Sequence, residues 1–188
     1  MSEQIYENRV AILARFALGV LNQTLGRTQM MKLFYFLQEL KGVPLGYDFR
    51  LYTYGPYESE VLSDLSSACG RGAVTENAIQ YGRGYGYAIT PAQHAEKLSA
   101  RLASDHPDTA RLADEVVRDF GSFSAGELEL RSTIFYVDRE AIDSASTFLK
   151  QDIADRVHQI KPHFTVATIL ECIRDMVTKR QLQSISDA

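Results

Sequence analysis

The residues that most often bind metals or act as nucleophiles are few in this sequence and lie far apart. They are four histidines and two cysteines: His94, His106, His158, His163, Cys69 and Cys172. No two histidines are three or four residues apart, the spacing that brings two imidazoles to one face of a helix around a zinc ion. Both cysteines fall on apolar faces of predicted helices, where a thiol packs as a small hydrophobic group. We therefore expect no metal site and no cofactor.

Other patterns that can support catalysis have simpler explanations here. Asp152 with Asp155, and Glu127 with Glu129, are candidate carboxylate pairs, but on helices such charges usually form a solvated outer face. The run Gly82-Arg83-Gly84-Tyr85-Gly86 is similar to a phosphate-binding loop, yet it lies between two strand-like segments instead of between a strand and a helix. No G-x-x-x-x-G-K-S/T or G-x-S-x-G motif is present. The sequence predicts a protein that is not an enzyme.

Tyrosine is the residue type that points most directly to binding. Five aromatic residues fall within eleven positions, and three tyrosines follow in the next predicted strands: Tyr47, Phe49, Tyr52, Tyr54, Tyr57, Tyr81, Tyr85 and Tyr87. Tyrosine combines a large apolar face with a polar tip at low rotamer cost, which favours interfaces. Two interpretations stay open: a surface that binds a partner, and simple packing of half of these rings between strand and helices.

The charges bear on what kind of partner such a surface would bind. No Lys or Arg occurs between residues 51 and 70, where the predicted third helix carries three acids. DNA phosphates would repel this helix where a winged helix enters the major groove. The acids favour a basic partner instead. The candidate contacts are therefore tyrosines, acids, one turn arginine and one lysine beside the apolar stripe of the second helix: Tyr54, Tyr57, Tyr85, Glu58, Glu60, Asp64, Arg83 and Lys32.

A mostly helical fold with one hairpin must position these residues. Apolar periodicity predicts helices near 5–21, 28–41, 57–69, 109–120, 125–137, 144–160 and 166–179, with another that begins at Thr90-Pro91. Alternation predicts a strand over 48–54 and a hairpin of 74–81 with 85–89. This order is close to that of a winged helix, and residues 62–90 resemble the wing region of MarR-type regulators.

The predicted fold class is α+β, mostly α. A winged-helix-like part over residues 1–104 precedes a helical part over residues 105–188, with the boundary near Pro107, and the two pack together as one globular unit. The formal charge of −4 gives no basic surplus for nucleic acid. Two isolated cysteines are typical of reduced thiols in a cytosolic protein. No apolar run approaches the roughly 18 residues of a membrane span, so we expect a cytoplasmic protein without membrane contact.

Two stretches together resemble a known family. They are Gly26-Arg27-Thr28-Gln29-Met30-Met31-Lys32-Leu33-Phe34-Tyr35-Phe36-Leu37-Gln38 and the segment from Phe49 that ends in Tyr54-Gly55-Pro56-Tyr57. The combination KL-x-YFLQ … YGPY is similar to the YwgA-type family and to the C-terminal domain of DarG antitoxins, and more distantly to Panacea (SocA-like) antitoxin domains. The likeness is densest over residues 10–90. It continues through Phe120-Gly121, Glu127-Leu128-Glu129, Ile160-Lys161-Pro162 and Phe164.

The resemblance implies a non-enzymatic domain that binds and neutralises or regulates a partner protein. In DarG the toxin is an ADP-ribosyltransferase that modifies DNA, and a separate macrodomain, for which this chain has no room, reverses the modification. The acids of the third helix would then mimic the phosphates that such a toxin binds. The expected function is that of an antitoxin-type domain of bacteria or phage. The alternative is a winged-helix DNA-binding transcriptional regulator.

Overall fold

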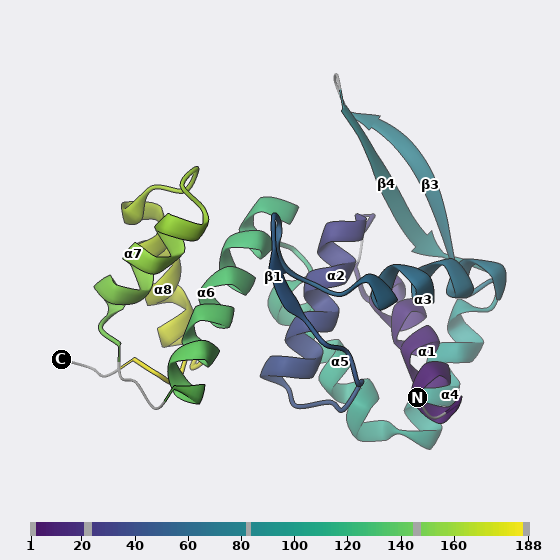
Figure 1. The fold of residues 1–188 in the computed structure, drawn as a ribbon. Coiled ribbons are helices and arrows are strands. Elements are labelled where there is room, and N and C mark those ends of the chain that lie inside the picture. Colours follow the sequence, from purple (N-terminus) through teal and green to yellow (C-terminus); the bar gives the residue numbers. More distant parts are fainter. Residues whose placement is uncertain (1–2, 21–23, 82–83, 145–147, 186–188) are drawn as a thin grey trace. The chain divides into compact units, whose positions relative to one another are not determined.

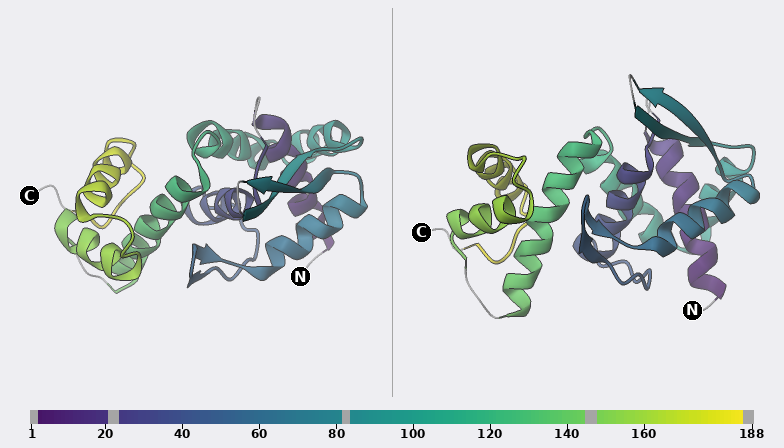
Figure 2. Two further views of the ribbon diagram at one scale, coloured as in Figure 1. Left: turned by 90° about the horizontal axis from the view of Figure 1, so that it is seen from above. Right: turned by 45° about the horizontal axis from the view of Figure 1, so that its top comes forward.

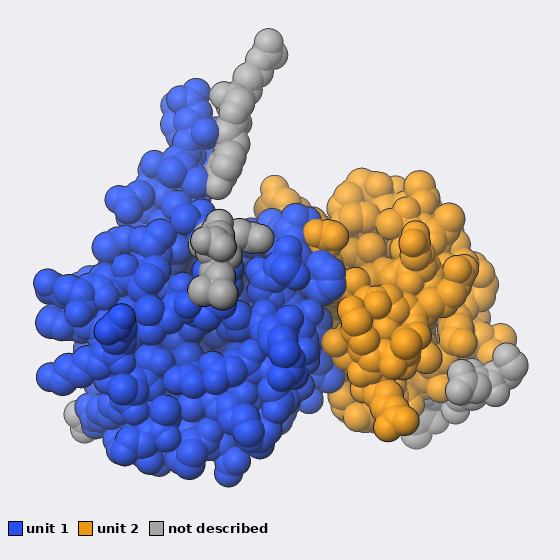
Figure 3. Space-filling view, turned by 180° about the vertical axis from the view of Figure 1, so that it is seen from behind, with its two compact units in different colours: residues 1–49, 57–125 blue, residues 50–56, 126–188 orange. Residues whose placement is uncertain are grey.

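The protein divides into two compact units in the computed structural model, which describes residues 3–20, 24–81, 84–144 and 148–185. The first unit holds residues 1–49 and 57–125, and the second holds residues 50–56 and 126–188 (Figure 3). The sequence placed a boundary after residue 104. The first unit instead continues to Ala125, because helix α5 (Pro107–Phe120) packs against α1 (Glu3–Gly19) and α4 (Ala95–Asp105).

Helix α1 is the central helix of the first unit. Its residues from Val10 to Ala17 are buried apart from Arg15, so it packs on several sides at once. Arg15 reaches Ser99 of α4 at 2.9 Å and Asp114 of α5 at 2.6 Å, which ties three helices together.

Helix α2 (Arg27–Tyr35) continues into a π-helical segment, η1 (Phe36–Leu40). The apolar stripe predicted here is buried, and Phe36 stacks on Phe120 of α5 with ring centroids 4.0 Å apart. The helix follows Gly26, whose N–H donates to Gln29 Oε1 at 2.8 Å, and it begins at Arg27, one residue before the predicted start at residue 28.

Helix α3 (Ser59–Gly70) leads into an antiparallel hairpin of β3 (Val74–Tyr81) and β4 (Gly84–Pro91). Figure 1 shows this hairpin projecting from the helices of the first unit. Leu25 pairs with Ile89 on the outer edge of β4, through N–H···O distances of 3.3 and 2.8 Å. Helices α1 to α3, this single bridge and the hairpin follow the order predicted for a winged helix. The helix start predicted at Thr90-Pro91 is wrong, because both residues pair with β3 and α4 begins at Ala95.

The second unit contains three helices and an arm taken from the middle of the sequence. The helices are α6 (Ala125–Asp143), α7 (Lys150–Ile160) and α8 (Val166–Thr178), and the arm is residues 50–56. Helices α7 and α8 pack side by side (Figure 2). Thr165 caps α8 as predicted, since its hydroxyl accepts the N–H of Thr168 at 3.2 Å.

The predicted class, α+β and mostly α, is confirmed. The strand expected over 48–54 is shorter, because only Arg50–Tyr52 forms β1, which pairs with β2 (Gly55–Tyr57). Tyr47 and Phe49 alternate as strand residues do, but their rings turn into the first unit and pack on Phe34 and Tyr35. Among the described residues, no helix is both long and apolar enough to cross a membrane.

Candidate protein-binding surface

A tight turn in the arm of the second unit exposes two tyrosines. Strands β1 and β2 are joined at Thr53-Tyr54, and Tyr52 and Tyr54 are 69% and 66% exposed. Gly55 follows with φ +84°, a conformation that side chains other than glycine rarely adopt. This explains the glycine of the YGPY motif. The turn 52–54 therefore presents aromatic rings on a backbone whose geometry is fixed by sequence.

A buried lysine holds this turn from beneath. Lys161, which follows the end of α7, is 2% exposed, and its ammonium donates to the carbonyl oxygen of Thr53 and lies 3.5 Å from that of Tyr52. Its charge is balanced by Glu129 of α6, whose Oε1 is 2.8 Å from Nζ. The expectation that Glu129 belongs to a solvated face is wrong, because this side chain is buried against Lys161. The turn, α6 and α7 thus meet at one ion pair.

Two histidines lie near Lys161: His158 in the last turn of α7 and His163 in the connection between α7 and α8. His158 Nδ1 is 2.8 Å from the carbonyl oxygen of Phe164, which fixes this connection locally. The His163 side chain is 58% exposed, with Nε2 3.7 Å from Glu129 Oε1. Its ring lies against that of Phe164, with centroids 4.2 Å apart. The partly exposed His163 ring therefore lies close to Glu129, the carboxylate that balances the charge of Lys161.

The acids predicted to face a partner take part in contacts within the first unit. Glu58 caps α3, since its carboxylate accepts the N–H of Glu60 at 3.0 Å. Glu60 pairs with Arg9 at 3.1 Å and remains partly exposed. Asp64 is 3% exposed, so the prediction that it contacts a partner is wrong. Its position on α3 faces the core instead of solvent.

Asp64 belongs to a buried polar cluster between α1, α3 and the loop after η1. Tyr47 donates its hydroxyl to Asp64 Oδ2 at 2.7 Å, and Arg9 Nη1 lies 3.3 Å from the same oxygen. Arg9 also donates to the carbonyl oxygen of Leu45 at 2.8 Å and stacks over the Tyr47 ring at 3.8 Å. Burial raises the pKa of Asp64 and that of Tyr47, because both charged forms lose hydration.

The remaining candidates separate into exposed and buried residues. Tyr57 is 37% exposed and Tyr85 is 82% exposed, which keeps both as candidate contacts. Lys32 on α2 is 1% exposed and so does not reach the surface. The prediction that it contacts a partner is therefore wrong. Arg83 lies outside the described residues. The exposed candidates are therefore tyrosines on the arm and on the hairpin.

The base of the hairpin is fixed by an arginine at the start of α2. Arg27 pairs with both carboxylate oxygens of Glu76, at 2.6 and 2.7 Å, and its guanidinium lies 3.5 Å from the centroid of the Tyr87 ring. The hydrogen bonds that Arg27 donates to the Glu76 carboxylate are the main reason why the pKa of Arg27 is raised. This anchors Tyr87 while Tyr85, two residues nearer the tip, stays exposed.

Helix α3 has the position of a recognition helix but not the surface of one. Its exposed residues are Ser59, Ser63, Ser66 and Gly70. No basic residue lies on this helix, so the groove-facing side would meet phosphates without any neutralising charge. Helix α3 therefore lacks the basic side chains with which a recognition helix neutralises phosphates.

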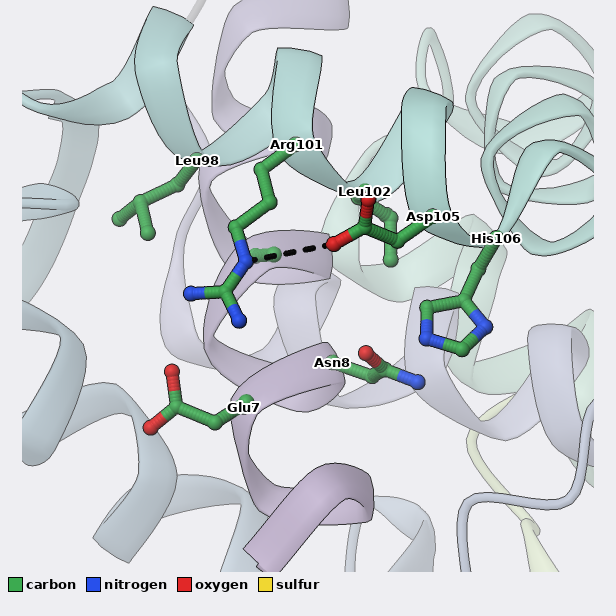
Figure 4. A pocket seen from close by; sticks show the side chains of 8 residues that line it. Glu7, Asn8, Leu98, Arg101, Leu102, Asp105 and His106 are labelled. Carbon is green, nitrogen blue, oxygen red and sulfur yellow. Dashed lines mark hydrogen bonds and ion pairs between the residues drawn. The ribbon is translucent and has the colours of Figure 1, made fainter.

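One hollow lies between α1 and α4 of the first unit (Figure 4). Three of its charged side chains form ion pairs: Arg101 lies 3.4 Å from Asp105, and Glu7 lies 2.6 Å from Arg71. The Arg71 hydrogen bond is the main reason why the pKa of Glu7 is lowered. Within the part of the chain that the structure describes, no three histidine, cysteine or acidic side chains form a group that could hold a metal ion.

Arg9, Glu129 and Lys161 had not been singled out as positioning residues from the sequence. Glu129 and Lys161 are 32 positions apart, and no local pattern connects them to residue 53 of the turn, which precedes them by 76 and 108 positions. Both residues do lie in the later segments of the resemblance to the YwgA-type family, Glu127-Leu128-Glu129 and Ile160-Lys161-Pro162. No protein-family model matches this chain, and a search of curated proteins finds no similar sequence. The relation to antitoxin domains therefore stays a prediction.

Proposed function

We propose that this chain is a non-enzymatic, cytoplasmic protein-binding domain of the antitoxin type, which neutralises or regulates a toxin-like partner. The observation that carries the proposal is the turn 52–54: two tyrosines about two-thirds exposed on a backbone held by a buried lysine. Aromatic side chains that are already ordered bind with less loss of entropy, which otherwise costs about 0.5–1.5 kcal/mol per side chain. Tyrosine is also among the residues that dominate binding energy at interfaces.

The tyrosines, more than the acids, support this function. Glu58 and Glu60 are engaged within the first unit, and Asp64 is buried, so mimicry of DNA phosphates has less support than an aromatic anchor. An ADP-ribosyltransferase acting on DNA stays the partner that the family resemblance suggests. The proposal itself requires only a protein that accepts the turn.

The test uses the protein encoded by the adjacent reading frame as the partner. Calorimetry should detect binding to the full chain, and Tyr52→Ser with Tyr54→Ser should weaken it by about 30-fold or more, as for an interface hot spot. Leu149→Ser is the matched control, since it removes a large apolar side chain that is 51% exposed and is not among the candidate contacts. Unchanged affinity of the double variant, or turnover of a metabolite by the purified chain, would contradict the proposal.

A DNA-binding regulator is the second candidate, favoured by the winged-helix order of α1–α3 and the β3–β4 hairpin. A gel-shift assay titrated with salt separates the two functions. Sequence-specific retention of duplex DNA at about 0.15 M salt would favour the regulator. Loss of all retention at that salt concentration would favour the protein-binding domain.

A further inference from the structure

We infer that the buried Glu129–Lys161 pair positions the binding surface: it fixes the turn 52–54 and so sets the affinity for the partner without touching it. The effect on binding rests on the proposed function, whereas the effect on the turn does not. The inference also specifies the partner's chemistry, an uncharged concave protein surface that accepts two tyrosine rings.

Three oxygen atoms lie around the ammonium group of Lys161. Its Nζ forms an ion pair with Glu129 Oε1 at 2.8 Å, and it donates to the carbonyl oxygens of Tyr52, at 3.5 Å, and of Thr53. Two of the three belong to successive residues of the turn. The lysine therefore recognises the turn through its backbone and restrains the peptide groups that carry Tyr52 and Tyr54.

Stability alone does not explain why a charged pair occupies this place. Two apolar residues of similar size usually fill a buried position at least as favourably as an ion pair. On α7 and α8 of the second unit, buried positions such as Ile153, Val157 and Ile173 are apolar, and the buried Asp138 of α6 accepts hydrogen bonds from Ser184. An apolar pair cannot donate to the carbonyl oxygens of Tyr52 and Thr53. The property that only the charged pair supplies is a defined conformation of the exposed turn.

The turn segment 51–57 contains no charged residue, and the charged residues that flank it in the chain, Arg50 and Glu58, have opposite signs. Residues 51–57 read Leu-Tyr-Thr-Tyr-Gly-Pro-Tyr, and the ammonium beneath them is buried and balanced by Glu129. A complementary partner surface would offer apolar contact for the rings and hydrogen-bonding groups for their hydroxyls. Binding to such a surface should depend little on salt, in contrast to binding by an acidic helix.

A paired apolar replacement tests the inference. Glu129→Leu with Lys161→Met removes both charges, so no unbalanced buried charge is left to unfold the unit. Without the ammonium, amide hydrogen exchange at residues 53–55 should become about 10- to 100-fold faster, as expected for lost hydrogen bonds to a charged donor. Binding to the adjacent-frame protein should weaken by about tenfold or more.

Two control variants separate positioning from direct contact. Lys179→Met removes an exposed lysine that pairs with Asp175 in the same unit and should change neither exchange nor affinity. Tyr52→Ser with Tyr54→Ser should weaken binding while exchange at residue 53 stays within about threefold of wild type. Unchanged exchange in the paired apolar variant would overturn the positioning role.

The remaining outcomes are equally decisive. Faster exchange with unchanged affinity would show that the turn is held by Lys161 but does not set binding, which also overturns the inference. If the tyrosine variant binds as wild type does, the proposed function fails, and the exchange data still decide whether Lys161 holds the turn. A more than tenfold loss of affinity between about 0.05 and 0.5 M salt would overturn the uncharged partner surface.

Discussion

Replacing Arg9 by methionine should destabilise the first unit by about 3–5 kcal/mol, the range for breaking a buried ion pair from one side. Methionine keeps much of the volume and removes every polar contact of the side chain. Asp64 would keep the Tyr47 hydroxyl, at 2.7 Å, as a hydrogen-bond donor, and the carbonyl oxygen of Leu45 would lose its 2.8 Å partner.

The size of the predicted loss in stability follows from the burial of Arg9 and Asp64. Arg9 is 0% exposed and Asp64 3% exposed, so water cannot replace the lost interaction. Arg101 and Asp105 form a pair of the same chemical type with side chains 60% and 48% exposed. Arg101→Met should therefore cost only about 0.3–0.5 kcal/mol, as for other exposed helix pairs. The contrast between the two variants isolates the contribution of burial.

Urea denaturation followed by circular dichroism and tyrosine fluorescence measures both variants, with agreement of the two probes as the check that one transition is observed. A loss of less than about 1 kcal/mol for Arg9→Met would refute the reasoning, because it would equal the effect of an exposed pair. The double variant Arg9→Met with Asp64→Leu should recover most of the loss, since no unpaired charge then remains inside.

Three other predictions address single residues. Gly55→Ala should destabilise the second unit by about 1–2 kcal/mol in urea, because φ is +84°, whereas Gly126→Ala on α6 should be neutral or stabilising. The native pKa of Asp64 lies above its ordinary 3.8 because of burial, so the native state binds this proton more tightly than the unfolded state does. Its contribution to stability therefore grows as pH falls through the native pKa toward 3.8 and is lost as pH rises again. Urea midpoints from neutral pH to about pH 4 should decline less in wild type than in Asp64→Asn, and a steeper decline in wild type would contradict this assignment. Burial raises the pKa of Cys172 to about 11, so at pH 8 iodoacetamide should alkylate it about 100-fold more slowly than free cysteine, as mass spectrometry can measure; equal rates would show that the thiol is exposed.

Local patterns determined most of the secondary structure. The apolar steps of α2 and α8 predict helices because burial of one face, repeated every three or four residues, outweighs modest differences in propensity. The hairpin follows from alternation and glycine in the same way. The errors fall where a tertiary contact replaces a local signal: Thr90-Pro91 has the composition of a helix start but completes a strand ladder with β3. Division of the chain into units was likewise decided by the packing of α5, not by Pro107.

The sequence by itself determined the elements, the absence of a basic surplus, and the concentration of tyrosines near the YGPY motif. Only the tertiary structure decided which polar residues lie inside. Asp64 looks like a surface acid until Arg9 and Tyr47, 55 and 17 positions away, close around it. Lys161 and Glu129 look like ordinary helix charges until the turn 52–54 lies on them. The physical reason is that a charge is solvated or buried according to partners distant in the chain, and local periodicity carries no information about them.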